Sequence, residues 1–547
     1  MDLHYSHLAA WAGIAIAGAV FYVFGVIVYR IFFHPLAKYP GPLLAKVTDA
    51  YMLYHAWKGD RHLEFWRLHE TYGPTVRFGP NSVSFNSNTA LKDIYGFKAN
   101  VGKADFYDAF AHPAHNTHNT RDKGEHARKR RVLAHAFSDS AVKEAEKYIL
   151  ANVRTFCDVI GAGGQACNAL RASRRDGGSE VSDHSEKYEK SEKWSAPVNM
   201  SDQCNYLAMD ILGDLCFGKA FNMLETPENR YAIDLVGMAA HRHLICGTMR
   251  TMEKLGVEKV LFRKIVAGRT RYVQYSRSQL ADRMALGDDT DRRDFFYYLL
   301  KAVDPETQRG FTKPELWGES NLLIIAGSDT TSTGMAATFF YLAHNPGTLA
   351  RATREVRETF ADVEEIQHGP ALTGCTYLRA CIDEAMRLSP AVGGLLPREV
   401  LAGGIEINGE RIPAGTVVGT PHYAIHHNAV YYPQPYTFLP ERWIAGSPLP
   451  GGGAVSEGDI ALAQSAFCPF SIGPRGCIGK GLAYTEMMTT LARALFLYDF
   501  RRAIGVVDPA KGVVGAEWGR HRPDEFQLMD TFTSVKKGVM LEIKPRV

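Results

Sequence analysis

The chain has 547 residues, of which 46% are hydrophobic and 22% charged, and its formal net charge at pH 7 is +3. These values are typical of a globular protein, and such a small net charge gives no reason to expect nucleic-acid binding. Nine scattered cysteines include no CxxC pair, which argues against a disulfide scaffold or a zinc site and favours a reducing compartment.

An apolar segment without formal charge, Leu8 to Tyr29, stands near the N-terminus. At about 1.5 Å per residue, a helix of this length crosses a hydrocarbon core of about 30 Å. No basic region precedes it and no small-residue cleavage site follows, so we expect an uncleaved, single-pass anchor rather than a signal peptide. Because Arg30, Lys38 and Lys46 come after it, the rest of the chain is expected in the cytosol. The alternative is a buried core helix.

The segments after the anchor predict a mainly α fold with a small β portion. Tyr39-Pro-Gly-Pro42 cannot continue a helix and is interpreted as a stiff hinge. Alternation around a Gly-Pro turn predicts a β-hairpin over Thr75 to Phe85, and short strands are predicted at 405–407 and 416–418. Helical spacing predicts the longest helices at 60–73, 125–137, 140–160, 201–217, 314–344, 346–360, 377–388 and 482–497.

Two segments have the composition of surface insertions. Arg171 to Lys193 is dominated by charged residues and has almost no apolar side chain, so it cannot bury enough surface to offset its ordering entropy. We expect 171–193 to be a disordered insertion. Ala445 to Asp459, rich in glycine and serine, is predicted to be a second flexible insertion.

A lone cysteine among glycines is the most informative feature of the sequence. The run Phe470-Ser-Ile-Gly-Pro-Arg475-Gly-Cys477-Ile-Gly-Lys480 precedes a predicted helix. Its glycines let the backbone turn tightly and approach a flat ligand. A thiol just before a helix N-terminus and near Arg475 is expected to favour the thiolate. The alternatives are a buried free cysteine, and a phosphate loop, which Pro474 and Gly481 exclude.

Two further motifs accompany this run. One motif, Ala326-Gly-Ser-Asp329-Thr330-Thr331, lies inside a predicted helix although its residues have low helix propensity. We expect its threonine hydroxyls to donate hydrogen bonds to preceding backbone carbonyls and to open the helix locally. Glu384-Ala-Met-Arg387 places an acid and a base on one helix face, and Pro440-Glu-Arg442-Trp443 supplies a further arginine. An ordinary kink and a surface ion pair are the alternatives for these motifs.

Together these motifs resemble those of the cytochrome P450 family, in the same order along the chain. The resemblance implies the fold of that family, with residues 1–38 as anchor and flank and 39–547 as a haem-thiolate catalytic domain. It implies haem b with Cys477 as the axial ligand of the iron and Phe470 in the binding loop. Thr330 would hydrogen-bond bound dioxygen, and Asp329 would relay protons. Glu384, Arg387 and Arg442 would form a buried structural network.

The resemblance also implies cations for the two haem propionates. Arg475 and Arg398 match the positions of two such cations. Many members have Trp-x-x-x-Arg at a third position, where this chain has His126-Ala-Arg-Lys-Arg130, and we assign the same role to Arg130 and His126. The histidines at 112, 115 and 118, and those at 422, 426 and 427, lack the acidic partner of a metal site. We interpret the first group as a loop over the active site.

The implied activity is monooxygenation of a hydrophobic small molecule, in the manner of fungal secondary-metabolism members at the endoplasmic reticulum. Electrons would come from NADPH through a separate cytochrome P450 reductase, for which Lys129, Arg130, Arg131 and Lys480 would form a basic docking patch. Pocket walls are expected at 106–118, 392–396 and 531–533, with Gly393 and Gly394 removing bulk. The alternatives are a haem-thiolate isomerase, dehydratase or ring-coupling enzyme without net oxygen insertion, and a non-enzymatic haem carrier or sensor.

Overall fold

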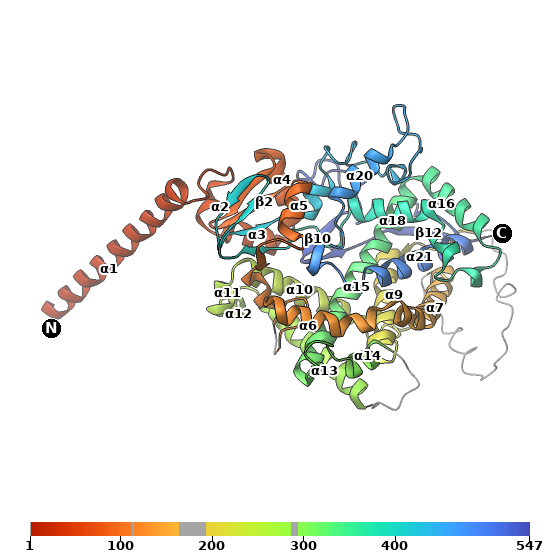
Figure 1. Ribbon diagram of the computed structural model, residues 1–547, viewed down its shortest axis with the longest axis horizontal. Coiled ribbons are helices and arrows are strands. Elements are labelled where there is room, and N and C mark those ends of the chain that lie inside the picture. The colour runs from red at the N-terminus through yellow and green to blue at the C-terminus, as the bar shows by residue number, and fades with distance from the viewer. Residues whose placement is uncertain (1, 112–113, 164–192, 286–293, 547) are drawn as a thin grey trace.

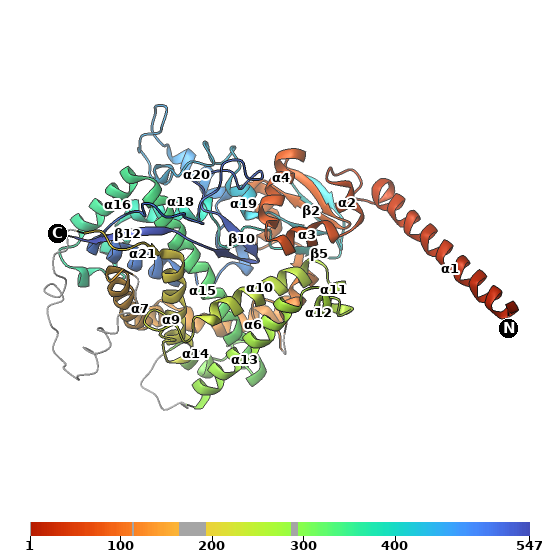
Figure 2. The ribbon, with the colours of Figure 1, turned by 180° about the vertical axis from the view of Figure 1, so that it is seen from behind.

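The computed structural model of the protein describes residues 2–111, 114–163, 193–285 and 294–546. The predicted insertion therefore lies outside the described residues from 171 to 192. One long helix, α1, projects away from the rest of the molecule, and the C-terminal strand ends on the opposite side of the body (Figures 1 and 2). The prediction of a mainly helical protein with a small β portion is confirmed.

Most of the predicted helices are present, with ends shifted by a few residues. The α-helices are α1 Asp2–Val28, α2 Leu43–Val47, α3 Ala50–Lys58, α4 Arg61–Tyr72, α5 Asn88–Tyr95, α6 Lys123–Ala134, α7 Asp139–Gly161, α9 Met200–Phe217, α10 Tyr231–Thr248, α11 Thr251–Lys254, α12 Glu258–Leu261, α13 Arg263–Ala285, α14 Phe295–Lys301, α15 Lys313–His344, α16 Pro346–Thr359, α17 Pro370–Thr373, α18 Thr376–Leu388, α19 His422–His426, α20 Glu457–Ala466 and α21 Lys480–Leu497.

Four small sheets carry the β portion of the described residues. The largest has the order β1-β2-β8-β5-β3, and only its β2–β8 pair is parallel. Two hairpins, β6–β7 and β10–β11, and the sheet β4-β12-β9 complete it. The strands are β1 Thr75–Gly79, β2 Ser82–Phe85, β3 Val101–Lys103, β4 Val198–Asn199, β5 Arg398–Val400, β6 Ile405–Ile407, β7 Glu410–Ile412, β8 Val417–Gly419, β9 Tyr498–Arg502, β10 Leu528–Thr531, β11 Thr533–Lys536 and β12 Met540–Pro545.

The core is built around α15, which passes through the centre of the helical part and packs against α9, α18 and α21 (Figure 1). A capping box fixes its start, because the Thr312 hydroxyl accepts from the Glu315 amide while the Glu315 carboxylate accepts from the Thr312 amide. Its close approach to α21 depends on Gly334, where a Cβ would stand 2.6 Å from the sulfur of Met487. From Thr331 to Ala343 every residue of α15 is buried.

The N-terminal apolar segment is a helix outside the core. Ala10–Phe33 has a mean hydropathy of 2.2, is not buried, and is long and apolar enough to cross a membrane. The alternative of a buried core helix is therefore wrong. The last residues of the segment, Tyr29–Phe33, form a π-helix that brings the chain to the body.

The predicted hinge connects this segment tightly to the first sheet. The carbonyl of Pro40 accepts a 2.8 Å hydrogen bond from the amide of Arg77, and a Cβ on Gly41 would run into the Arg77 carbonyl. Gly41 has φ +155, so this approach needs a residue without a side chain.

The prediction of a flexible 445–459 insertion is wrong at its C-terminal end. Ser456 caps α20, since its hydroxyl accepts from the Asp459 amide and the Asp459 carboxylate accepts in return from the Ser456 amide. Only the part before Ser456 is a loop, and three successive glycines at its tip, Gly451 to Gly453, have positive φ angles.

Candidate active site

The cysteine run forms a compact loop immediately before α21. The amide of Cys477 donates to the carbonyl of Phe470 at 2.9 Å, and the amide of Gly476 donates to that of Gly473 at 3.0 Å. Gly473 has φ +69, and a Cβ there would collide with the carbonyl of Tyr95. The loop therefore needs glycine at this position both for its turn and for its contact with α5.

The thiol of Cys477 is exposed, whereas the other cysteines that the structure describes are buried. Protein atoms nevertheless surround the thiol closely, and this desolvation raises the pKa of Cys477. The Gly479 amide and the charges of Arg130 and Lys480 lower that pKa. These groups therefore favour the thiolate, as expected, but they offset the effect of burial only in part. A bound metal cation would have to supply the missing stabilisation, as it does when it coordinates a thiol.

The predicted propionate-binding cations gather beside this loop. Arg130 donates to the carbonyl of Gly476 at 2.6 Å, Arg398 to the hydroxyl of Tyr107 at 3.2 Å, and Arg475 to the carbonyl of Thr120 at 2.7 Å. None of these three guanidinium groups forms an ion pair with a carboxylate in the part of the chain that the structure describes.

These cations repel one another. Burial and then the charge of Arg398 lower the pKa of Arg475 to about 10, and burial with Arg475 and other cations lowers that of His126 to about 3. Lys103, which sequence reasoning missed, is buried in the same cluster, and its pKa is lowered by burial, Arg398 and Arg475. A group of buried and half-buried cations that forms no ion pair with a carboxylate of the described residues is suited to a dianionic ligand, so these residues fit the two carboxylates of haem.

The predicted basic docking patch is not present as expected. Lys129 is buried and pairs with Glu315 at 2.9 Å, and Arg131 forms an ion pair with Asp304. Arg130 points to the cysteine loop, as described above. Lys480 alone of the four is exposed and without such a partner among the described residues.

Thr330, the predicted dioxygen-binding residue, lies with Ala326 on an accessible stripe of α15, whose middle is otherwise largely buried. Ala326 is exposed and Thr330, one turn later, is half-buried, while Asp329 is buried. The hydroxyl of Thr330 donates to the carbonyl of Ala326 at 2.6 Å, which is the predicted back-bond. The expected opening of the helix is absent, because α15 is continuous from Lys313 to His344.

Asp329 points away from this stripe, toward the C-terminal hairpin β10–β11. The hydroxyl of Thr533 donates to its Oδ2 at 2.9 Å. Burial raises the pKa of Asp329, and the charge of Lys536 and the Thr533 hydrogen bond oppose that rise. Sequence reasoning named Thr533 only as a pocket wall and missed Lys536, since nothing in the sequence connects the hairpin with α15.

Glu384, Arg387 and Arg442 are brought together and buried. Arg387 makes a bidentate ion pair with Glu384, with N–O distances of 2.9 and 2.8 Å, and Arg442 Nε donates to Glu384 Oε1 at 3.0 Å. Trp443 adds an indole N–H to Oε2 at 3.0 Å. Arg387 also donates to the carbonyl of His426, so the network joins α18, α19 and the segment that leads to the cysteine loop.

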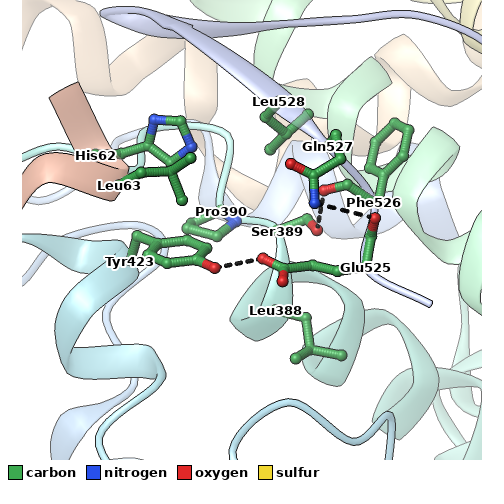
Figure 3. A pocket seen from close by; sticks show the side chains of 10 residues that line it. All are labelled: His62, Leu63, Leu388, Ser389, Pro390, Tyr423, Glu525, Phe526, Gln527 and Leu528. Atoms are coloured by element: carbon green, nitrogen blue, oxygen red, sulfur yellow. Dashed lines mark hydrogen bonds between the residues drawn. The ribbon is translucent and has the colours of Figure 1, made fainter. Parts of the chain in front are cut away.

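The predicted role of two pocket-wall glycines is wrong. A Cβ on Gly393 would stand 2.9 Å from that of His62, and one on Gly394 would strike the guanidinium of Arg61. These glycines therefore make room for α4 rather than for a ligand. The nearby cavity in Figure 3, between His62, Tyr423 and Glu525, measures about 10 Å³, which is too small for more than a water molecule.

Of the histidines singled out in the sequence, five lie among the described residues: His115, His118, His422, His426 and His427. No cluster of three or more metal-ligating side chains occurs among the described residues. His118 instead packs against Phe110 and Phe532, with ring centroids 5.4 and 5.5 Å apart. His112 lies outside the described residues.

Comparisons with known proteins point to one family. The family model described as "Cytochrome P450" matches residues 178–509. The chain is 39% identical over 527 residues to the cytochrome P450 monooxygenase AKT7 of Alternaria alternata, covering 96% of this chain and 95% of the relative. It is 39% identical over 539 residues to the monooxygenase atnE of Emericella nidulans, covering 98% and 96%. The similarity to apf7 of Gibberella fujikuroi is 36%, covering 95% and 96%.

A helical fold with a cysteine loop before α21 and cations suited to propionates defines a haem-thiolate protein. The chain belongs to the cytochrome P450 family. It is an oxidoreductase of the monooxygenase type with haem iron as its cofactor, so the alternative of a non-enzymatic carrier is not supported.

Proposed function

We propose that the protein inserts one atom of O2 into a hydrophobic small molecule, by hydroxylation or epoxidation, in secondary-metabolite biosynthesis. The second oxygen atom leaves as water, with two electrons from NADPH and two protons. The observation that carries the proposal is the exposed thiol of Cys477 in a glycine loop, beside buried and half-buried cations that form no ion pair among the described residues. Similarity to fungal monooxygenases supports the pathway class.

The residues divide the work of this reaction. Cys477 would bind the iron, and Arg130, Arg398 and Arg475, with His126 beside them, would hold the propionates. Phe470 supports the loop, since its ring packs 5.1 Å from that of Tyr484 on α21. When bound, haem supplies the reductive activation of dioxygen.

Asp329 and Thr330 would deliver the protons. The back-bonded hydroxyl of Thr330 borders the accessible stripe of α15, where it can turn toward a ligand. Asp329 has a raised pKa because it is buried, which brings its protonated form nearer to the working pH. This acid–hydroxyl pair favours oxygen insertion over isomerisation or dehydration, because those reactions can proceed without delivered protons.

The anchor and the electron donor complete the proposal. Ala10–Phe33 would hold the enzyme in the endoplasmic reticulum membrane with the catalytic domain in the cytosol. Electrons would come from NADPH through a cytochrome P450 reductase on the same membrane. Lys480 remains a candidate contact for an acidic partner, since it is exposed at the start of α21.

The test is the difference spectrum of the dithionite-reduced protein with and without carbon monoxide. We expect the strongly red-shifted Soret band of thiolate ligation in the wild type and its loss in Cys477→Ser. Cys468→Ala is the matched control, because Cys468 is buried in the same segment and should leave the band in place. A band at the ordinary haem–CO position in the wild type, or no haem at all, would overturn the assignment of Cys477.

A further inference from the structure

Lys536, the last residue of β11, is a buried cation with an unusual set of partners. Only 8% of it is exposed, and its ammonium donates to Asn205 Oδ1 on α9 at 2.6 Å and to Ser332 Oγ on α15 at 2.8 Å. Both acceptors are neutral, and no carboxylate forms an ion pair with Lys536 in the described part of the chain. A cation held in this way is costly unless a nearby charge compensates it.

The compensating charge is that of Asp329. Burial lowers the pKa of Lys536 to about 8, and the charge of Asp329 is the largest influence that opposes this fall. In return, Lys536 opposes the rise of the Asp329 pKa. Asp202, Cys204 and Tyr272 are the further titratable groups that face this pair from α9 and α13.

The strand β11 brings both of its polar ends onto one turn of α15. At one end the Thr533 hydroxyl donates to the carboxylate of Asp329 at 2.9 Å. At the other end Lys536 binds Ser332, whose hydroxyl also lies 3.2 Å from the Asp329 carbonyl. The hairpin itself is fixed near its turn by the buried ion pair between Arg61 and Asp530, with an N–O distance of 3.2 Å.

From this arrangement we infer that Thr533 and Lys536 are positioning residues for Asp329, which hold its carboxylate oriented and available for proton transfer to the oxygen site. The inference rests on the proposed function, since it assigns to the hairpin the control of the acid used there. Both residues would act through Asp329. A lysine with only a structural role would need nothing beyond its two neutral acceptors. Here Thr533 donates a hydrogen bond to the carboxylate of Asp329, and Lys536 interacts with the charge of that same carboxylate.

Proton supply can be measured without knowing the substrate. In the substrate-free reaction with NADPH and a recombinant NADPH-dependent flavoprotein reductase, O2 takes two electrons and two protons to give hydrogen peroxide, or four of each to give two water molecules. The share of NADPH electrons recovered as peroxide therefore reports how often proton delivery to the oxygen site fails.

The decisive variants change one donor at a time. We expect Thr533→Val, which keeps the shape and removes the hydroxyl, to raise the peroxide share at least two-fold. Thr533→Ser should retain the wild-type share because it keeps the donor. Lys536→Met should raise the share, and Lys537→Met, an exposed neighbour on the same segment, is its control. Wild-type shares in both Thr533→Val and Lys536→Met would overturn the inference.

A second readout is independent of turnover. The readout is a double-mutant cycle of melting temperatures on the haem-loaded enzyme. Lys536→Met should lower the melting temperature more when Asp329 is present than in an Asp329→Asn background. Equal costs would show that the two charges do not interact and would contradict the inference. Should Lys536→Met fail to bind haem, the Thr533→Val and Thr533→Ser pair decides alone. A wild type without the red-shifted carbon monoxide band would instead refute the proposed function.

Discussion

Glu384 and Asp329 are both buried carboxylates on core helices, yet their surroundings are opposite. Glu384 accepts from two arginines, an indole and the Leu439 amide, and these partners hold its pKa below the ordinary value despite its burial. Asp329 has one hydroxyl donor and a cation that makes no direct ion pair, so burial prevails and its pKa is raised. A fully paired carboxylate holds segments together, whereas a partly paired one can gain and lose a proton.

The largest effect should come from removing the charge of Glu384. Glu384→Gln leaves Arg387 and Arg442 buried without their counter-ion, at a cost of about 3–5 kcal/mol in the free energy of unfolding. We expect little haem incorporation, measured as the carbon monoxide band per mole of protein. A variant with normal haem content and melting temperature would show that the network does not hold the cysteine segment.

Asp329→Asn should have the reverse profile. We expect haem content at pH 7 close to that of the wild type, because Asp329 lies on α15 and takes no part in the network that holds the cysteine segment. Substrate oxidation, once a substrate is found, should fall about 10²-fold, which is the lower range for loss of a proton-transfer group. Normal turnover in this variant would remove Asp329 from the mechanism.

A smaller effect is expected when one neutral donor of the Glu384 network is lost. Trp443→Phe keeps the aromatic packing on Phe467 but removes the indole N–H, so it should cost about 1.5–3 kcal/mol, the range for a hydrogen bond to a charged group. Thermal unfolding followed by the loss of the Soret band would measure it. No change would imply that the two arginines satisfy Glu384 without help.

The two carboxylates should also impose opposite pH dependences. Since the folded pKa of Glu384 lies below its unfolded value, its stabilising contribution is present above about pH 4.5 and is lost as the pH falls through the folded pKa. Since that of Asp329 is raised, its contribution decreases as the pH rises above about 3.9. Melting curves above pH 4 should show Asp329→Asn gaining on the wild type with rising pH, whereas Glu384→Gln should lose ground only as the pH rises toward about 4.5 and should run parallel to the wild type above it. The opposite pattern would contradict both assignments.

The smallest effect belongs to an exposed carboxylate in a comparable pair. Glu410 bonds Lys38 at 2.7 Å, but their side chains are 46% and 59% exposed. Glu410→Gln should change the free energy of unfolding by less than about 1 kcal/mol, and added salt should reduce the difference further. A loss as large as that of Glu384→Gln would mean that burial does not explain the contrast.

Local motifs predicted the parts of the site that are encoded within a few residues. The cysteine loop, the Thr330 back-bond and the pairing of Glu384 with Arg387 all follow from short spacings. The Thr533–Asp329 contact joins positions 204 residues apart, and no local pattern reports such a distance. The same limit explains why the prediction that Gly393 makes room for a ligand is wrong. The sequence does not distinguish a glycine that makes room for a ligand from one that makes room for a neighbouring helix.

The junction between the N-terminal apolar helix and the body determines where a form of the enzyme without that helix should begin. Arg30 donates to the carbonyl of Val47 at 2.5 Å, and Arg77 donates to the carbonyl of Arg30 at 2.8 Å. The last turn of the apolar segment is therefore hydrogen-bonded to the body of the protein. These bonds restrict rotation of the body relative to the apolar helix. A water-soluble form should be cut within α1, before Tyr29, because a cut after Phe33 would leave the guanidinium of Arg77 without one of its acceptors.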